Sequence, residues 1–216
     1  ILKNQNNIPN FKIHRKFHSA PIYKGDVIEE DSVSSHHLVY EPVDQSVIDR
    51  FVEEELIYEL PLSPSIVRLV RDPVSNVKYV KKMVLKEYLD EEMLNQIRKE
   101  CVIHSHMDNE NIAKIYEYSE NEKSIDMIIE YCNKPKYFED RLEESFDPIE
   151  DDSKVKEYAI SILKALKYIH SAGFIHCDMK LANVMLHENE DGNEEIKLID
   201  FGLSHGRDPL MDGKIC

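Results

Sequence analysis

The sequence predicts an α+β fold, in which a strand-rich first part with one long helix precedes a helical second part. Short runs of Val, Ile and Tyr, bounded by turns, fill much of the region before Pro135, as is typical of strands. One segment there, Asp90–His106, instead carries apolar residues at intervals of three and four, which indicates an amphipathic helix. A second pattern of this kind begins near Ser153.

The other elements of the first part are a short helix and four strands. The helix is predicted at Ser46–Leu56, and the strands at Ile66–Arg71, Val74–Val84, Ile112–Tyr118 and Ser124–Tyr131. Asp72-Pro73 separates the first two strands, because proline cannot donate a hydrogen bond within a sheet.

The second part begins with a long helix that Ser153 can cap and that Gly173 ends. Short apolar runs follow at Phe174-Ile175, Val184–Leu186 and Ile196–Ile199. The acidic stretch between the last two runs predicts a hairpin loop with Asp191-Gly192 at its tip.

Composition excludes several classes of protein. The 216 residues carry a formal charge of −15, which argues against nucleic-acid binding because phosphates would be repelled. The apolar content of 42% indicates a globular chain, and no apolar run approaches the roughly 18 residues of a transmembrane helix. The cysteines are few, widely separated and without CxxC spacing, so we expect reduced thiols and a cytoplasmic location.

Charge is distributed unevenly along the chain. Residues 1–25 carry five basic residues and no acidic one, so the rest of the chain has a net charge of −20. We expect residues 1–45 to form a basic, flexible N-terminal extension. Such an arm is compatible with a solvated tail, or with contacts to an acidic partner, a membrane surface or the acidic body of the same chain.

Two segments carry residue types that suit phosphoryl transfer. They are His176-Cys177-Asp178-Met179-Lys180-Leu181-Ala182-Asn183 and Ile196-Lys197-Leu198-Ile199-Asp200-Phe201-Gly202. Asp178 can accept a hydroxyl proton, and Lys180 can neutralise phosphate charge. Asn183 and Asp200 offer the oxygen ligands that Mg²⁺ prefers. Each triplet alone is common, but the two together, with a helix before them and a hairpin between, form a specific pattern.

These segments resemble the catalytic loop and the Asp-Phe-Gly motif of the eukaryotic protein kinase family. Lys180, two residues after Asp178, is similar to the serine/threonine branch, including its calcium/calmodulin-dependent-kinase-like group. The resemblance implies a bilobal fold, with a small, mostly antiparallel β lobe at 46–131 and an incomplete helical lobe at 132–216 that ends in the activation loop. It also implies transfer of the ATP γ-phosphate to a serine or threonine of a protein substrate, with ATP and Mg²⁺ as cofactors.

The resemblance assigns further residues to the site. Lys82 and Glu100 would form the family's ion pair between a strand and a helix, with Lys81 as the alternative lysine. Ile129 would be the gatekeeper between the lobes, and backbone groups of Glu130 and Cys132 would bind adenine. The full set implied to bind nucleotide is Leu60, Val67, Val80, Lys82, Ile129, Glu130, Cys132 and Met185.

The loop expected to cover the nucleotide departs most from the family. Its three glycine positions fall on Leu60, Leu62 and Ser65, and Pro61 and Pro64 lie between them. Glycines let a backbone approach phosphates and prolines remove donors, so weaker or differently shaped nucleotide binding is expected.

Two further departures concern single residues. Cys177 stands where the family often has an arginine that receives a phosphate, which implies activity independent of that switch. His104 stands at an apolar position beside Phe201 and His176, where we expect a neutral core residue. The departures leave a pseudokinase, a nucleotide-binding or scaffold module without turnover, as the alternative function.

Overall fold

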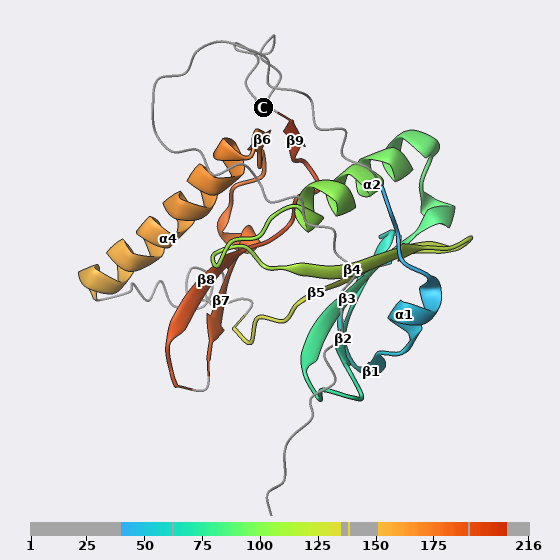
Figure 1. Cartoon of the computed structure of the whole chain (residues 1–216), viewed down its shortest axis with the longest axis horizontal. Helices are drawn as coiled ribbons and strands as arrows, with labels where there is room; N and C mark the ends of the chain where they lie inside the picture. Colours follow the sequence, from blue (N-terminus) through green and yellow to red (C-terminus); the bar gives the residue numbers. More distant parts are fainter. Residues whose placement is uncertain (1–39, 62, 135–137, 139–150, 190, 207–216) are drawn as a thin grey trace, which may run out of the picture. The chain divides into compact units, whose positions relative to one another are not determined.

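The first part of the chain is a five-stranded antiparallel sheet in the order β1-β2-β3-β5-β4 (Figure 1). The computed structural model describes residues 40–61, 63–134, 138, 151–189 and 191–206. The strands of the sheet are Val52–Glu59 (β1), Ser65–Arg71 (β2), Lys78–Leu85 (β3), Ile115–Glu120 (β4) and Ser124–Glu130 (β5). Each neighbouring pair is antiparallel, which agrees with the mostly antiparallel β lobe that the resemblance implies.

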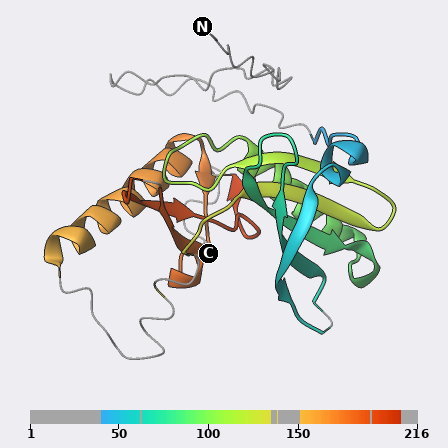
Figure 2. The same cartoon turned by 90° about the horizontal axis from the view of Figure 1, so that it is seen from below.

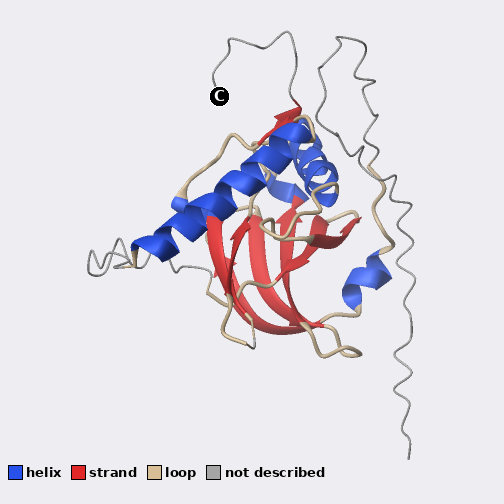
Figure 3. Cartoon of the chain, turned by 60° about the vertical axis from the view of Figure 1, so that its left-hand side comes forward, coloured by secondary structure: helices blue, strands red, loops and turns tan. Residues whose placement is uncertain are grey.

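Helical segments accompany the strands (Figure 3). They are α1 (Gln45–Asp49), the 3₁₀ turn η1 (Lys86–Tyr88), α2 (Glu91–Ser105) and α4 (Asp152–Ser171). The prediction of α2 is confirmed, because Asp90 caps it by accepting a hydrogen bond from the amide of Met93 at 2.8 Å.

Short paired strands follow α4 (Figure 2). They are β6 (Phe174–Ile175) with β9 (His205–Gly206), and β7 (Val184–Glu188) with β8 (Glu194–Leu198); the 3₁₀ turn η2 (Leu181–Asn183) precedes β7. The predicted β7–β8 hairpin is confirmed, and Gly192 lies at φ +79°, a conformation that favours glycine. Gly173 likewise lies at φ +83° after α4.

Backbone hydrogen bonds join the sheet-bearing part to β8. The amide of Ala113 donates to Leu198 at 2.9 Å, and the amide of Leu198 donates to Asn111 at 2.8 Å. Around this junction lies an apolar cluster built from the C-terminal end of α2, one face of α4, and strands β7 and β8. The segment that follows β8 is therefore fixed relative to α2.

Two of the predicted boundaries are clearly wrong. The helix predicted at Ser46–Leu56 is only α1, because the residues from Val52 onward pair with β2 as β1. The strand predicted from Val74 begins at Lys78, since the preceding residues form a turn. In this turn the backbone amide of Asp72 donates to the carbonyl of Val77 at 3.0 Å. In both places a short apolar run did not distinguish helix, strand and turn.

The cap of α4 also differs from the prediction. Asp151, and not Ser153, is the N-cap, and its Oδ1 accepts from the amides of Ser153 at 2.9 Å and Lys154 at 3.4 Å. Ser153 instead donates its hydroxyl to Asp151 at 2.6 Å.

Cys101 and Cys132 are buried free thiols, as expected. Of the other two cysteines, Cys177 lies in the loop before Asp178, and Cys216 lies outside the described residues. Among the described helices, none is both long enough and apolar enough to cross a membrane. Residues 1–39, which hold the basic arm, lie outside the described residues.

The cap assignment predicts unequal effects of two neighbouring substitutions. Asp151→Ala should lower the free energy of unfolding by about 1 kcal/mol, because two amides of the first turn lose their acceptor. Ser153→Ala should cost less than half as much, since it removes only a hydroxyl donor. Urea denaturation of both variants measures this, and a larger loss for Ser153→Ala would contradict the assignment.

Candidate active site

The alternation of β3 separates its two central lysines. Successive strand residues point to opposite faces, so Lys82 shares a face with Val80 and Val84, and Lys81 points to the other. Lys82 Nζ contacts Glu100 Oε1 of α2 at 2.6 Å, whereas Lys81 Nζ lies 3.4 Å from Asp126 Oδ2. The structure therefore joins Lys82 to Glu100, and it engages the alternative Lys81 elsewhere.

The carboxylate of Glu100 is buried, with only 3% of its side chain exposed. Burial by itself lowers the pKa of Lys82, but the negative charges of Glu100 and Asp200 outweigh it and raise that pKa above its ordinary value. Lys82 is consequently a cation that pairs with Glu100 and is also stabilised by the charge of Asp200.

The loop after β8 packs directly under this ion pair. A Cβ at Gly202 would lie 3.1 Å from Asp200 Oδ1 and 3.5 Å from Glu100 Oε2, so a side chain there would crowd Asp200 and touch Glu100. The amide of Gly202 donates to Asp200 Oδ1 at 3.1 Å, and its carbonyl accepts from Gln96 Nε2 of α2 at 2.7 Å. Asp200 lies at φ +63°, an uncommon conformation for a residue with a side chain.

The second loop presents Asp178. Its Oδ2 accepts from Lys180 Nζ at 2.7 Å and from Asn183 Nδ2 at 2.9 Å, and Asn183 Nδ2 also donates to the backbone carbonyl of Asp178 at 2.8 Å. The hydrogen bond from Lys180 is the main reason why the pKa of Asp178 is lowered, so its carboxylate is ionised at neutral pH. Cys177, at φ +60°, turns the chain just before it.

His176 links the two loops. Its Nε2 bonds to the carbonyl of Ile199 at 3.1 Å, and its own carbonyl accepts from Ser204 Oγ at 3.1 Å. Burial lowers the pKa of His176, while the carboxylates of Asp178 and Asp200 oppose this shift. The carboxylates of Asp178 and Asp200 are thus both close enough to the His176 ring to raise its pKa.

An aromatic column supports the loop from beneath. The rings of His104 and Phe201 stack with centroids 4.6 Å apart, and His176 lies 5.1 Å from Phe201 on a tilted plane. His104 Nε2 donates to the carbonyl of Ala113 at 2.5 Å. His104 is buried, so the prediction that it is a core residue is confirmed.

Several residues expected to bind nucleotide share the face of the sheet that carries Lys82. Val67 of β2 pairs with Lys82, and Val80 pairs with Ile129 of β5. Cross-strand partners point to the same side, so these three aliphatic side chains and Lys82 are neighbours. They are half-buried and provide an apolar surface that suits a flat ring.

The connection after β5 brings the second part of the chain alongside. The amide of Glu130 donates to the carbonyl of Lys114 at 2.8 Å, while its carboxylate contacts Lys197 Nζ at 3.0 Å. Lys134 and Leu186 exchange backbone hydrogen bonds of 3.1 and 3.3 Å, which sets β7 and its half-buried Met185 beside this connection. Cys132 lies between these two anchor points and is buried.

The glycine-free loop joins β1 to β2. Leu60 is 54% exposed, and its carbonyl accepts from the amide of Ser63 at 3.0 Å in a tight turn. Leu62 lies outside the described residues, and Ser65 is already the first residue of β2.

The donors near Asp200 fit a hard divalent cation. The amide nitrogen of Asn183 faces Asp178, so its oxygen is turned the other way, and carboxylate and amide oxygens are what Mg²⁺ prefers. Within the described part of the chain, no group of three or more His, Cys, Asp or Glu residues could hold a metal by itself.

Sequence reasoning missed Gln96. It holds the carbonyl of Gly202 although it lies 106 residues away in the chain. Its position four residues before Glu100, on the same face of α2, was the available signal.

Comparison with known proteins agrees with this geometry. A model of the protein kinase domain matches residues 63–209. The probable serine/threonine-protein kinase MARK-A of Dictyostelium discoideum is 30% identical over 132 residues, which are 61% of this chain and 12% of that protein. NUAK family SNF1-like kinase 1 of Mus musculus is 34% identical over 134 residues, covering 60% of this chain and 18% of the relative.

A plant relative is covered more fully. Serine/threonine-protein kinase Aurora-1 of Arabidopsis thaliana is 29% identical over 139 residues, which are 64% of this chain and 45% of that protein. The match thus spans less than half of each of these three relatives.

The buried histidine predicts a pH-dependent stability. Burial lowers the pKa of His104 from its ordinary 6.5 to about 4, so between these values the unfolded chain binds more protons than the folded one. The free energy of unfolding should therefore fall with falling pH, and His104 alone should account for about 2 kcal/mol between pH 7 and pH 5.

Urea denaturation of wild type and His104→Leu at both pH values tests this. The difference between the two proteins isolates His104 from other titrating groups, including His176. Parallel loss of stability in wild type and variant would contradict the prediction.

Proposed function

Because the chain belongs to the protein kinase domain family, we propose that it transfers the γ-phosphate of ATP to a serine or threonine hydroxyl of a protein substrate. The observation that carries this proposal is the Lys82–Glu100 ion pair of 2.6 Å, with the Asp200 loop packed directly under it. An ion pair and a metal-binding loop that meet in this way support a triphosphate site.

In this proposal each loop has one task. Asp178, ionised and held by Asn183, accepts the proton of the attacking hydroxyl or orients it for in-line attack. Lys180, 2.7 Å from Asp178, steadies the negative charge of the transferring group. Lys82 would contact the α- and β-phosphates, and Glu100 would fix its direction.

The cofactor residues follow from the same face of the sheet. Val67, Val80 and Ile129 would contact the adenine ring from the sheet side, with Leu60 and Met185 completing the apolar surface. Backbone groups of Glu130 and Cys132 would bind the edge of the base. Asn183 and Asp200 would hold Mg²⁺, whose positive charge would neutralise the phosphates when it is bound.

A pseudokinase is the second candidate. The glycine-free loop favours it, because fewer backbone amides can approach the phosphates. The assembled Lys82–Glu100 pair and the Asp178–Lys180–Asn183 hydrogen bonds favour turnover instead, since a scaffold has no need of them. A cytoplasmic location and an acidic partner for residues 1–25 remain proposals from the sequence.

The proposed base predicts a loss of turnover in Asp178→Asn. Transfer of labelled γ-phosphate to a peptide library containing serine and threonine should fall at least about a hundredfold, because the amide cannot accept the proton. Asp191→Asn, at the exposed tip of the β7–β8 hairpin, is the matched control and should retain wild-type activity. Equal activity of Asp178→Asn and wild type would refute the assignment.

Nucleotide binding should also be visible without catalysis. At a hundredfold excess over Kd, ATP with Mg²⁺ should raise the free energy of unfolding by about 2.7 kcal/mol, measured as a rise in Tm. Asp200→Asn should lose the part of this rise that depends on Mg²⁺. No rise in wild type at millimolar nucleotide would point to a scaffold that does not bind ATP.

A further inference from the structure

The segment Tyr40–Phe51 clasps the outer edge of the sheet, and we call it the N-terminal clasp. It precedes the residues that match the protein kinase domain, which begin at residue 63. The amide of Val43 donates to the carbonyl of Tyr118 at 2.8 Å, and Val43 forms a parallel bridge with Ser119 of β4. Since β4 is an edge strand, the clasp covers backbone groups that would otherwise face outward.

On the α2 side of the sheet, the clasp contributes one aromatic ring. Tyr40 stacks on Tyr118 with centroids 5.3 Å apart and planes inclined by 29°. Tyr40 packs against the apolar cluster that contains Cys101 of α2 and, at its border, Leu94 and Ile97 of the same helix. The ring therefore lies where β4 and α2 meet.

On the opposite side, the clasp contributes core residues. Ile48 is fully buried and Phe51 is nearly so, both against Val70 of β2 and Ile128 of β5. Phe51 also meets the ring of Tyr79 edge-on, with centroids 5.4 Å apart. The clasp thus packs against both faces of the sheet, and these contacts oppose movement of the edge strand β4.

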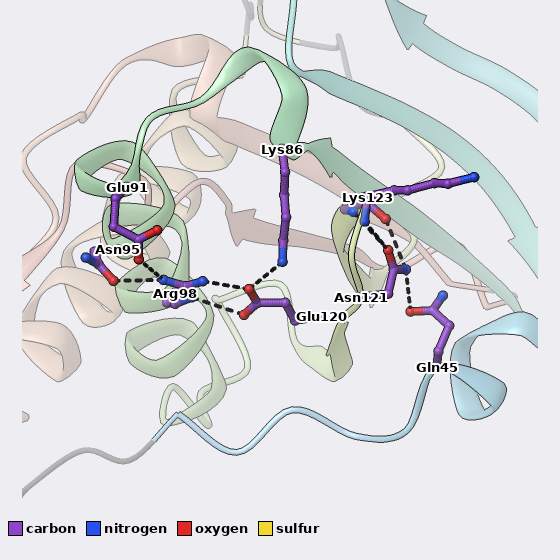
Figure 4. A network of polar contacts seen from close by, with 9 residues as sticks. Gln45, Lys86, Glu91, Asn95, Arg98, Glu120, Asn121 and Lys123 are labelled. Carbon is purple, nitrogen blue, oxygen red and sulfur yellow. Dashed lines mark hydrogen bonds and ion pairs between the residues drawn. The ribbon is translucent and has the colours of Figure 1, made fainter.

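Hydrogen bonds from Gln45 fix the turn between these two contacts. Gln45 Oε1 accepts from Asn121 Nδ2 at 2.9 Å (Figure 4). It also accepts from Ser119 Oγ at 2.8 Å, and Gln45 Nε2 donates to the buried Asp126 at 3.1 Å. A single amide therefore ties α1 to both β4 and β5.

The strand that the clasp holds also anchors α2. Arg98 of α2 donates to both carboxylate oxygens of Glu120, at 3.1 and 2.7 Å, and Lys86 approaches the same carboxylate at 2.6 Å (Figure 4). Arg98 lies two residues before Glu100. The hydrogen bonds from Arg98 are the main reason why the pKa of Glu120 is lowered to about 2, so this anchor is charged at neutral pH.

We propose that the N-terminal clasp positions α2, and through it the Lys82–Glu100 ion pair, with Tyr40 as the main positioning residue. Among the described strands, β4 provides the principal contact of α2 with the sheet. If the β4 edge could shift, the hydrogen bonds between Arg98 of α2 and Glu120 of β4 would weaken. The helix α2 could then move and carry Glu100 away from Lys82. The catalytic consequence rests on the proposed kinase function, whereas the structural consequence does not.

The test compares three substitutions in the full chain. Tyr40→Ala removes the stacked ring, Tyr40→Phe keeps it, and Tyr88→Ala removes an exposed tyrosine of η1 as a matched control. Amide hydrogen exchange of α2 should become about tenfold faster in Tyr40→Ala and stay unchanged in Tyr40→Phe and Tyr88→Ala. The kcat/KM for ATP should fall about tenfold in the first variant only, with rescue by phenylalanine.

Two outcomes would overturn the inference. Either α2 exchanges at the wild-type rate in Tyr40→Ala, or exchange accelerates equally in β3 and α4, which would mean general destabilisation. If Tyr40→Ala does not fold, Tyr40→Leu, which keeps apolar volume but not stacking, takes its place with the same readouts. A wild type that transfers no phosphate would refute the proposed function, while the exchange of α2 would still decide the role of the clasp.

Discussion

The burial of the Glu100 carboxylate is the constraint on which the rest of the site depends. A buried anion without a partner is strongly destabilising, so a cation must reach it. Lys82 reaches it because β3 places every second residue on the face of the sheet that α2 covers. The packing of α2 on the sheet brings Glu100 within 2.6 Å of Lys82 Nζ. A Cβ built at Gly202 would lie 3.5 Å from the same carboxylate, so the loop that carries Asp200 packs closely against Glu100.

The two acidic loops share a second constraint, because each turns through an uncommon backbone conformation. Cys177 and Asp200 both lie near φ +60°, and His176 holds the loops together by bonding to Ile199 and Ser204. Such strained positions persist where surrounding contacts fix them, as the stack of His104 on Phe201 does here. Asp178 and Asp200 are therefore held in place before any ligand arrives.

Sequence patterns predicted much of the fold and most of the candidate site. The intervals of three and four in α2, the Asp191-Gly192 turn and the spacing of the catalytic segments are local properties, and the structure agrees with them. The choice of Lys82 over Lys81 also followed from the sequence, through the family resemblance. Errors occurred at Ser46–Leu56 and at the start of α4, where a short run of residues is compatible with more than one local structure.

What the sequence determined by itself was which residues form α2, the β7–β8 hairpin and the two acidic loops, because side-chain periodicity and turn chemistry act over only a few residues. The tertiary structure decided which distant groups meet. Gln96 reaches Gly202 across 106 positions, and Glu41 reaches the Tyr118 hydroxyl across 77. Such contacts depend on the packing of whole elements against one another, and this is why residues 40–45, expected to belong to a flexible extension, contact β4 and β5.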